Sequence, residues 1–204
     1  MADIKNVLLE LGYSENCVKT MVRNFPNILG LTEGRIRNRI DELVGLGYST
    51  ANVRRMTIEY PGLFGYSLEK IKEKLKGIED IGYTPQEVKR ITKKFANLIG
   101  FSKERFKKKI EDLTKLGFSE NEIIKISKSF PQIIGYSVER TEVRINDLMS
   151  LGFSRDVVLK MIIINPVLLG YSMTSIKNMM NEFEHLGYTR RRCYKAYWKL
   201  SQNI

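Results

Sequence analysis

The sequence predicts an all-α protein, a superhelical solenoid of 35-residue repeats in which each repeat holds two α-helices and a short 3₁₀ turn. Three observations support this prediction: a Gly-aromatic-Ser/Thr triplet recurs every 35 residues, a second glycine recurs with the same period, and apolar residues at helical spacing lie between them. A fixed period without insertions is typical of a stacked array. The spacing leaves the handedness of the superhelix, right or left, open.

Two series of glycines define the repeats. The first series is Gly12, Gly47, Gly82, Gly117, Gly152 and Gly187, and the second is Gly30, Gly65, Gly100, Gly135 and Gly170. They give one solenoid domain over 1–204, with repeats 12–46, 47–81, 82–116, 117–151 and 152–186. Because no repeat can bury its apolar stripe without a neighbour, residues 1–11 and 187–204 are predicted to cap the two ends.

The first helix of each repeat is expected to begin after a hydroxyl residue that accepts a free backbone N–H. The candidates are Ser14, Ser49, Thr84, Ser119, Ser154 and Thr189. Glu87 and Glu122 complete capping boxes, and Pro85 stands at a first helical position, where a missing N–H costs nothing.

A proline then ends the first helix, at Pro26, Pro61, Pro131 and Pro166, with Ala96 in the third repeat. The run 131–135 reads as a 3₁₀ turn whose glycine takes a conformation closed to side chains. A second helix follows each cap residue, which is Thr32, Ser67, Ser102, Ser137 or Ser172. The glycine of the next Leu-Gly or Ile-Gly is predicted to end it as a left-handed C-cap.

Composition favours a polyanionic partner, because 34 Lys and Arg residues outnumber 23 Asp and Glu residues and give a formal net charge of +11. The two cysteines, Cys17 and Cys193, occupy matching repeat positions and form no CxxC pair, which favours a reducing intracellular compartment. No apolar run approaches the length of a membrane span, and no secretory signal or transit peptide is visible.

Catalysis is not expected. The single histidine, His185, lies beside a helix end, and there is no metal-ligand cluster, no nucleophile with a matched base and no phosphate loop. The sequence therefore predicts a monomer that is not an enzyme and that uses no cofactor, metal or small-molecule substrate.

Cations recur at three fixed positions of the repeat. The first column is Arg35, Lys70, Arg105 and Arg140, with Ser175 in the fifth repeat. The second, one turn later, is Arg39, Lys74, Lys109 and Arg144, with Met179 in the fifth. The third, on the first helix, is Arg55, Arg90, Lys125, Lys160 and Lys195, with Thr20 in the first repeat.

Each column has a structural alternative to ligand binding. The second column is spaced for helical ion pairs, as in Arg39–Glu42, Lys109–Asp112 and Arg144–Asp147. The third column can equally be a solvated helix face. The aromatic residues Tyr66, Phe101, Tyr136 and Tyr171 are interpreted as wedges between repeats rather than as stacking platforms for bases.

The first column is harder to explain by folding. Lys70, for example, is the third residue of its helix, where a cation opposes the helix dipole by about 0.3–1 kcal/mol. Folding alone would favour Glu there, although Glu69 and its equivalents offset part of the unfavourable field. If an anion binds at the helix N-terminus, it interacts favourably with both the helix dipole and the cation, so the position becomes suitable for a cation. Phosphate is the natural candidate for this anion.

The stretch LGFSENEIIKISKSFPQIIGYSVERTEVRINDL, residues 116–148, resembles the repeat of the mitochondrial transcription termination factor-like (mTERF) family. The resemblance rests on the Leu-Gly-Phe/Tyr-Ser opening, the Pro-x-x-Leu/Ile turn, the Gly-Tyr-Ser and the amphipathic helix that follows, over residues 11–186. It implies an α-superhelix whose basic concave surface binds double-stranded nucleic acid, with no catalytic residues. It also implies a mitochondrial or other organellar location, with the bacterial cytoplasm as the alternative.

We therefore expect a nucleic-acid-binding protein that contacts phosphates, on duplex DNA before RNA, and that regulates or terminates transcription. The alternative is a solenoid scaffold, or an RNA-binding repeat protein, that docks an acidic partner. Periodic charge favours nucleic acid as the partner, because a protein partner does not require a cation at the same position of each repeat.

Overall fold

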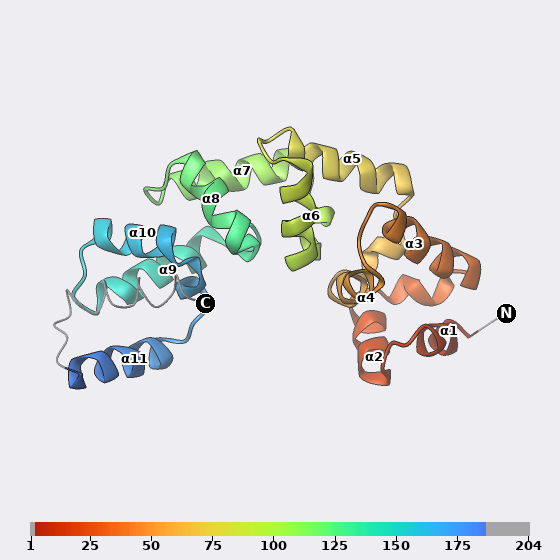
Figure 1. Ribbon diagram of the computed structural model, residues 1–204, viewed down its shortest axis with the longest axis horizontal. Helices are drawn as coiled ribbons and strands as arrows, with labels where there is room; N and C mark the ends of the chain where they lie inside the picture. The colour runs from red at the N-terminus through yellow and green to blue at the C-terminus, as the bar shows by residue number, and fades with distance from the viewer. Residues whose placement is uncertain (1–2, 187–204) are drawn as a thin grey trace. The chain divides into compact units, whose positions relative to one another are not determined.

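The computed structural model describes residues 3–186, and every element in that range is an α-helix or a 3₁₀ helix (Figure 1). The chain divides into two compact units, residues 1–108 and 109–204. Within the described range no helix is both long enough and apolar enough to cross a membrane.

The repeats follow the predicted order of a first helix, a 3₁₀ turn and a second helix. Before the first repeat lies α1 (Ile4–Glu10). The first helices are α2 (Glu15–Asn24), α4 (Thr50–Glu59), α6 (Pro85–Lys94), α8 (Glu120–Ser129) and α10 (Arg155–Ile164). The 3₁₀ turns are η1 (Pro26–Gly30), η2 (Pro61–Phe64), η3 (Ala96–Gly100), η4 (Pro131–Ile134) and η5 (Pro166–Leu169). The second helices are α3 (Glu33–Gly45), α5 (Leu68–Glu79), α7 (Lys103–Thr114), α9 (Val138–Met149) and α11 (Met173–His185).

Hydroxyl caps fix the helix starts as predicted. The Ser67 hydroxyl accepts the Lys70 backbone N–H at 3.1 Å, and both capping boxes, at Thr84 and Ser119, are complete. Ser154 stands at the N-cap of α10 but makes no side-chain cap hydrogen bond, so this prediction holds for its position only. Thr189 lies outside the described residues.

The core forms between repeats, because each repeat exposes an apolar stripe that only its neighbour can cover. One cluster joins Leu43 of the first repeat with Met56 of the second and Ile99 of the third, all of them fully buried. The first helices α2 and α4 lie side by side, as do α8 and α10 in the second unit (Figure 1). Thr141, which interrupts the stripe of α9, is buried and donates its hydroxyl to the Ser137 carbonyl at 3.1 Å.

The described members of the first glycine series have the predicted left-handed conformation, with φ +84° at Gly12 and +88° at Gly47, and Gly187 lies outside the described residues. For the second series this prediction is wrong, since φ is −80° at Gly65 and −86° at Gly135. The positive φ values therefore belong only to the glycines that end second helices.

At Gly65 and Gly100, close approach of a ring, rather than backbone conformation, explains the second glycine. A Cβ on Gly65 would lie 3.1 Å from Phe25 Cζ, and one on Gly100 would lie 2.8 Å from Tyr60 Oη. Both rings end the first helix of the preceding repeat. Gly30, in the first repeat, has no upstream ring and nothing within 4 Å of its Cβ position.

Buried hydroxyls also connect successive repeats. Tyr13 Oη and Thr57 Oγ1 are 2.7 Å apart, and Tyr48 Oη and Thr92 Oγ1 are 2.8 Å apart. The equivalent positions of the fourth and fifth repeats carry Phe118 and Ile162, both buried and both apolar. In these three pairs the two positions are either both hydroxylated or both apolar, as expected where an unpaired buried hydroxyl is costly.

We predict that Gly100→Ala destabilises the protein by about 1–3 kcal/mol, because the added methyl group overpacks against Tyr60. Gly30→Ala is the matched control, and it should be neutral or slightly stabilising because its Cβ meets open space. Urea denaturation followed by circular dichroism measures both. Equal effects at the two positions would contradict the ring explanation.

We predict that Thr57→Val costs about 1–3 kcal/mol, because it leaves the buried Tyr13 hydroxyl without its partner. The double variant Tyr13→Phe/Thr57→Val copies the apolar combination of Phe118 and Ile162 and should recover part of that cost. A double-mutant cycle from urea denaturation gives the coupling free energy. Strictly additive single effects would show that the two hydroxyls do not act as a pair.

Candidate nucleic-acid interface

Cations of the second column lie between repeats. Arg39 is only 1% exposed and donates to the Glu42 carboxylate and to the carbonyl oxygen of Tyr66 in the next repeat. Lys74 donates to the carbonyl of Phe101, again 27 residues ahead, at 3.3 Å. These side chains connect the end of one 3₁₀ turn to the second helix of the preceding repeat.

The fourth repeat keeps a variant of this arrangement. Arg144 lies 3.5 Å from Asp147 and its side chain is 19% exposed, and Lys109 of the third repeat is half-buried. The expected helical pairs Arg39–Glu42 and Arg144–Asp147 are both present. Because the Arg39 guanidinium is enclosed by protein, its contacts contribute to packing between repeats.

The first column has three different environments. Arg35 donates to three carbonyls of the following repeat, those of Phe64 at 3.3 Å, Gly65 at 3.4 Å and Tyr66 at 2.6 Å. Lys70 is exposed and forms an ion pair with Glu73 at 2.8 Å. Both cations already have protein partners, so each must lose a contact before it can bind a ligand.

Arg105 and Arg140, the other two members, are exposed and stack on aromatic rings. Their guanidinium carbons lie 3.9 Å from the centroid of the Phe101 ring and 3.8 Å from that of Tyr136. Each ring stands four residues earlier, just before the helix. Neither guanidinium has a carboxylate partner among residues 3–186.

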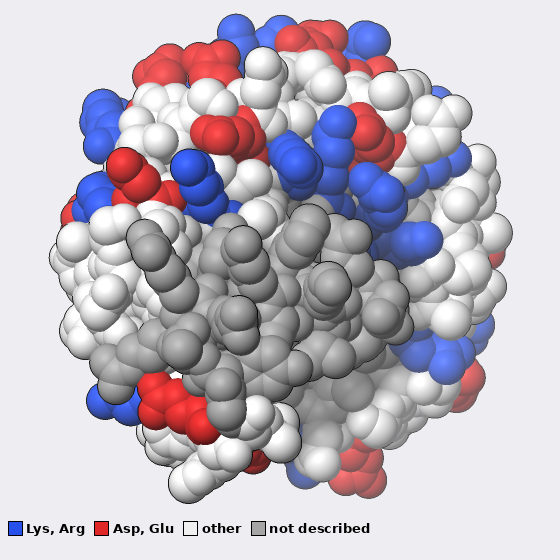
Figure 2. Space-filling model, turned by 60° about the vertical axis from the view of Figure 1, so that its left-hand side comes forward, with Lys and Arg blue, Asp and Glu red and all other residues white. Residues whose placement is uncertain are grey.

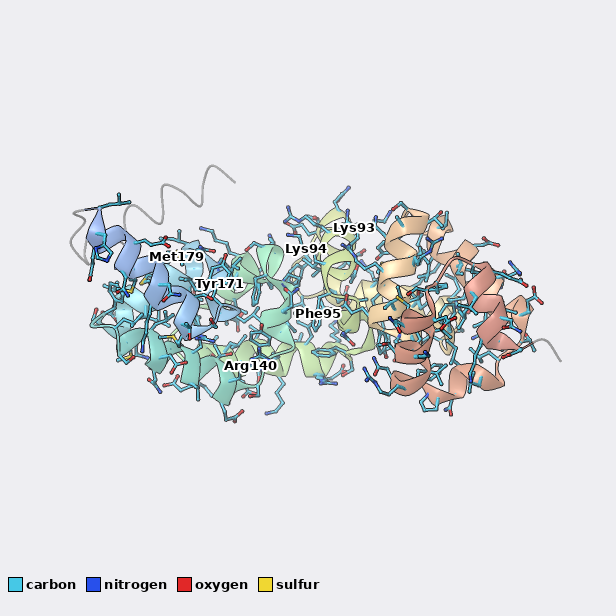
Figure 3. The ribbon with its side chains drawn as sticks, turned by 90° about the horizontal axis from the view of Figure 1, so that it is seen from below. Lys93, Lys94, Phe95, Arg140, Tyr171 and Met179 are labelled. Atoms are coloured by element: carbon cyan, nitrogen blue, oxygen red, sulfur yellow. The ribbon has the colours of Figure 1, made fainter. Side chains whose placement is uncertain are left out.

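The stacking explains how a cation is tolerated at the third position of these helices. The face of an aromatic ring attracts a cation and offsets part of the helix dipole. In the fifth repeat the ring remains, as Tyr171, which is 40% exposed, while Ser175 replaces the cation. Figure 3 labels Arg140 and Tyr171 in the second unit.

The recurrent aromatic residues therefore do more than separate repeats. Tyr66 is half-buried, its hydroxyl lies 2.8 Å from that of Tyr60, and Lys74 Nζ is 5.3 Å from its ring centroid. Phe101 and Tyr136 support arginines. The sequence interpretation did not identify this support, although the spacing of four residues between ring and cation was visible.

In the third column the four described members are all exposed, namely Arg55, Arg90, Lys125 and Lys160, and Lys195 lies outside the described residues. Arg55 also crosses to the next repeat, where its Nη2 donates to the carbonyl of Lys93 at 2.6 Å. This contact brings Arg55 to the C-terminal end of α6, next to Lys93 and Lys94, which Figure 3 labels. Sequence reasoning missed these two lysines, because their positions do not carry a cation in every repeat.

A carboxylate lies close to the same helix end. Glu59 accepts the Ala96 backbone N–H at 3.1 Å and the Asn97 side-chain N–H at 3.3 Å. Ala96 stands where four repeats have proline, so its N–H needs an acceptor that proline would not require. Burial raises the pKa of Glu59, and these hydrogen bonds, together with the charge of Arg55, offset part of the rise.

No arrangement for catalysis or metal binding is present among residues 3–186. No group of three or more His, Cys, Asp and Glu residues in this range could hold a metal ion. His185 is exposed in the last turn of α11, and Cys17 is a half-buried free cysteine. Cys193 lies outside the described residues.

Two-helix repeats joined by side chain to backbone contacts, with cations exposed on their surfaces, define a basic helical-repeat protein. The mTERF family model matches three overlapping stretches, residues 1–78, 35–146 and 78–189. The chain therefore belongs to the mTERF family, as the sequence resemblance indicated. No match is found among the curated proteins.

We predict that Glu59→Gln is more stable than the wild type at pH 7 and equally stable at pH 4. The raised pKa means that the folded state favours the uncharged carboxyl. Glu59 therefore stabilises the protein at a pH below 4.5, its pKa in the unfolded chain, and this stabilisation is lost as the pH rises through its pKa in the folded protein. Glutamine keeps an acceptor for Ala96 without the charge. Urea denaturation at both pH values tests this, and a less stable variant at pH 7 would contradict it.

Proposed function

We propose that the protein binds nucleic acid, with duplex DNA preferred over RNA, mainly through backbone phosphates, and that it influences transcription by occupying a site on the template. The observation that carries this proposal is the pair of exposed arginines, Arg105 and Arg140, each stacked on a ring. Membership of the mTERF family supports the same class of ligand.

A stacked arginine is well suited to phosphate. The ring occupies one face of the guanidinium and restricts its orientation, while the N–H groups around the edge of the plane stay available for bidentate hydrogen bonds. Less side-chain entropy is then given up when the ligand arrives. An ion-paired lysine such as Lys70 must instead leave its carboxylate first.

Phosphate contacts of this kind fix the position of a protein on a duplex but do not read sequence. We therefore assign a share of the affinity, and no base preference, to these arginines. The enzymatic alternative has no supporting group of residues in the described range. A scaffold that docks an acidic protein remains the competing function, and the salt dependence and competitor preference of binding separate the two.

We predict that Arg105→Gln/Arg140→Gln weakens binding to duplex DNA and lowers the slope of log K against log salt by about 1.8, which is about 0.9 for each phosphate that the variant no longer neutralises. Fluorescence anisotropy at several salt concentrations measures both quantities, on duplex DNA, single-stranded DNA and RNA. The helical circular dichroism should not change, because both side chains are exposed.

The matched control is Arg37→Gln/Lys115→Gln, which removes the same charge from the same two units. Both control cations are ion-paired, Arg37 with Glu33 at 2.7 Å and Lys115 with Asp112 at 2.6 Å. The control should keep nearly the wild-type slope. No binding by the wild type to any of the three nucleic acids would refute the proposed function, and equally weakened binding in both double variants would remove the stacked arginines from the site.

A further inference from the structure

Positive charge is concentrated in one repeat. The third repeat, residues 82–116, holds ten Lys and Arg residues against four Asp and Glu residues, whereas the other four repeats together hold eighteen against seventeen. Five more Lys and Arg residues fall in 187–204, outside the described range. Figure 2 agrees with an uneven distribution, because Lys and Arg cluster on one part of the face shown and mix with Asp and Glu elsewhere on it.

The first helix of this repeat, α6, has one buried face and one face that carries Lys and Arg. Val88, Ile91 and Thr92 are buried against the neighbouring repeats. The other face of the same turns carries Lys89, Arg90, Lys93 and Lys94. Lys93 is half-buried and the other three are exposed. Since residues three and four apart share a face, Arg90 lies beside both Lys93 and Lys94.

Arg55 extends this group across the repeat boundary. Its guanidinium donates to the carbonyl of Lys93, at the negative end of the α6 dipole. We call Arg55, Arg90, Lys93 and Lys94 the α6 patch. All four belong to the first unit, and three of them come from the last two turns of one helix.

Two cations of the α6 patch, Arg90 and Lys93, form no ion pair within the described chain. The Glu59 carboxylate, which accepts hydrogen bonds from Ala96 and Asn97, is the negative charge that acts on Arg55. Some cations of the balanced repeats are ion-paired. Lys19 lies 3.8 Å from Glu15 and Lys70 lies 2.8 Å from Glu73.

We infer that the α6 patch is the principal anchor for the phosphate backbone, so that affinity comes mainly from one repeat instead of being shared equally along the array. This inference rests on the proposed function. Affinity for a polyanion grows with the counterions that the protein displaces, and cations such as Arg90 and Lys93 displace more of them than cations that already have a carboxylate. Because the α6 patch contacts phosphates, it should bind without regard to sequence.

The test compares two double variants of the full chain, Arg90→Gln/Lys93→Gln in the α6 patch and Lys19→Gln/Arg23→Gln on α2. Arg23 holds the same repeat position as Lys93, and α2 belongs to a repeat of nearly balanced charge. Both variants remove two positive charges from a first helix of the first unit and leave 187–204 intact. Binding to one duplex DNA and to a scrambled duplex of the same length is measured by fluorescence anisotropy from low to moderate salt.

For Arg90→Gln/Lys93→Gln we expect affinity to fall roughly 10–100-fold at about 0.1 M salt and the salt slope to fall by about 1.8, equally on both duplexes. For Lys19→Gln/Arg23→Gln we expect a smaller loss of affinity and of slope, because Lys19 already has the Glu15 carboxylate as its partner. If the wild type binds and the two double variants are weakened equally, the anchor is refuted while the proposed function stands. If the wild type binds no duplex at all, the proposed function fails and this inference with it.

Discussion

Packing between consecutive repeats is the constraint on which this structure depends. A two-helix unit of 35 residues cannot cover its own apolar stripe, so its stability is a property of the interface with the next unit. The chain uses several kinds of interaction there: apolar clusters, paired hydroxyls such as Tyr13 and Thr57, and arginines that donate to carbonyls. Apolar packing is common to these interfaces, whereas the polar contacts vary from one repeat to the next.

This constraint explains which parts of the fold could be read from the sequence. The period, the helix caps and the left-handed glycines at Gly12 and Gly47 depend on a few neighbouring residues, and local rules identify them. The second glycine series was misread because its cause is not local. Gly65 is small to admit Phe25, a ring 40 residues earlier, and no rule that considers only the turn itself can detect that requirement.

The same limit applies to the candidate site. A periodic cation was interpreted as a ligand contact, yet periodicity is equally the mark of an interface between repeats, and the structure places Arg39 and Arg35 there. Their partners are backbone carbonyls, which every sequence possesses, so no pattern of residue types could reveal them. Arg105 differs from Arg35 in one readable respect, because an aromatic residue precedes it by four positions where Arg35 has Leu31.

Departures from the period then become the more informative signal for function. A residue that every repeat carries can be explained by stacking alone, whereas the adjacent pair Lys93 and Lys94 occurs in the third repeat and in no other. In that repeat the turn also lacks its proline, and the resulting Ala96 N–H holds the Glu59 carboxylate. That hydrogen bond places a carboxylate beside the C-terminal end of α6, where its charge acts on Arg55. A change that is local to one repeat thus alters the electrostatics of one surface without disturbing the interfaces that the array needs.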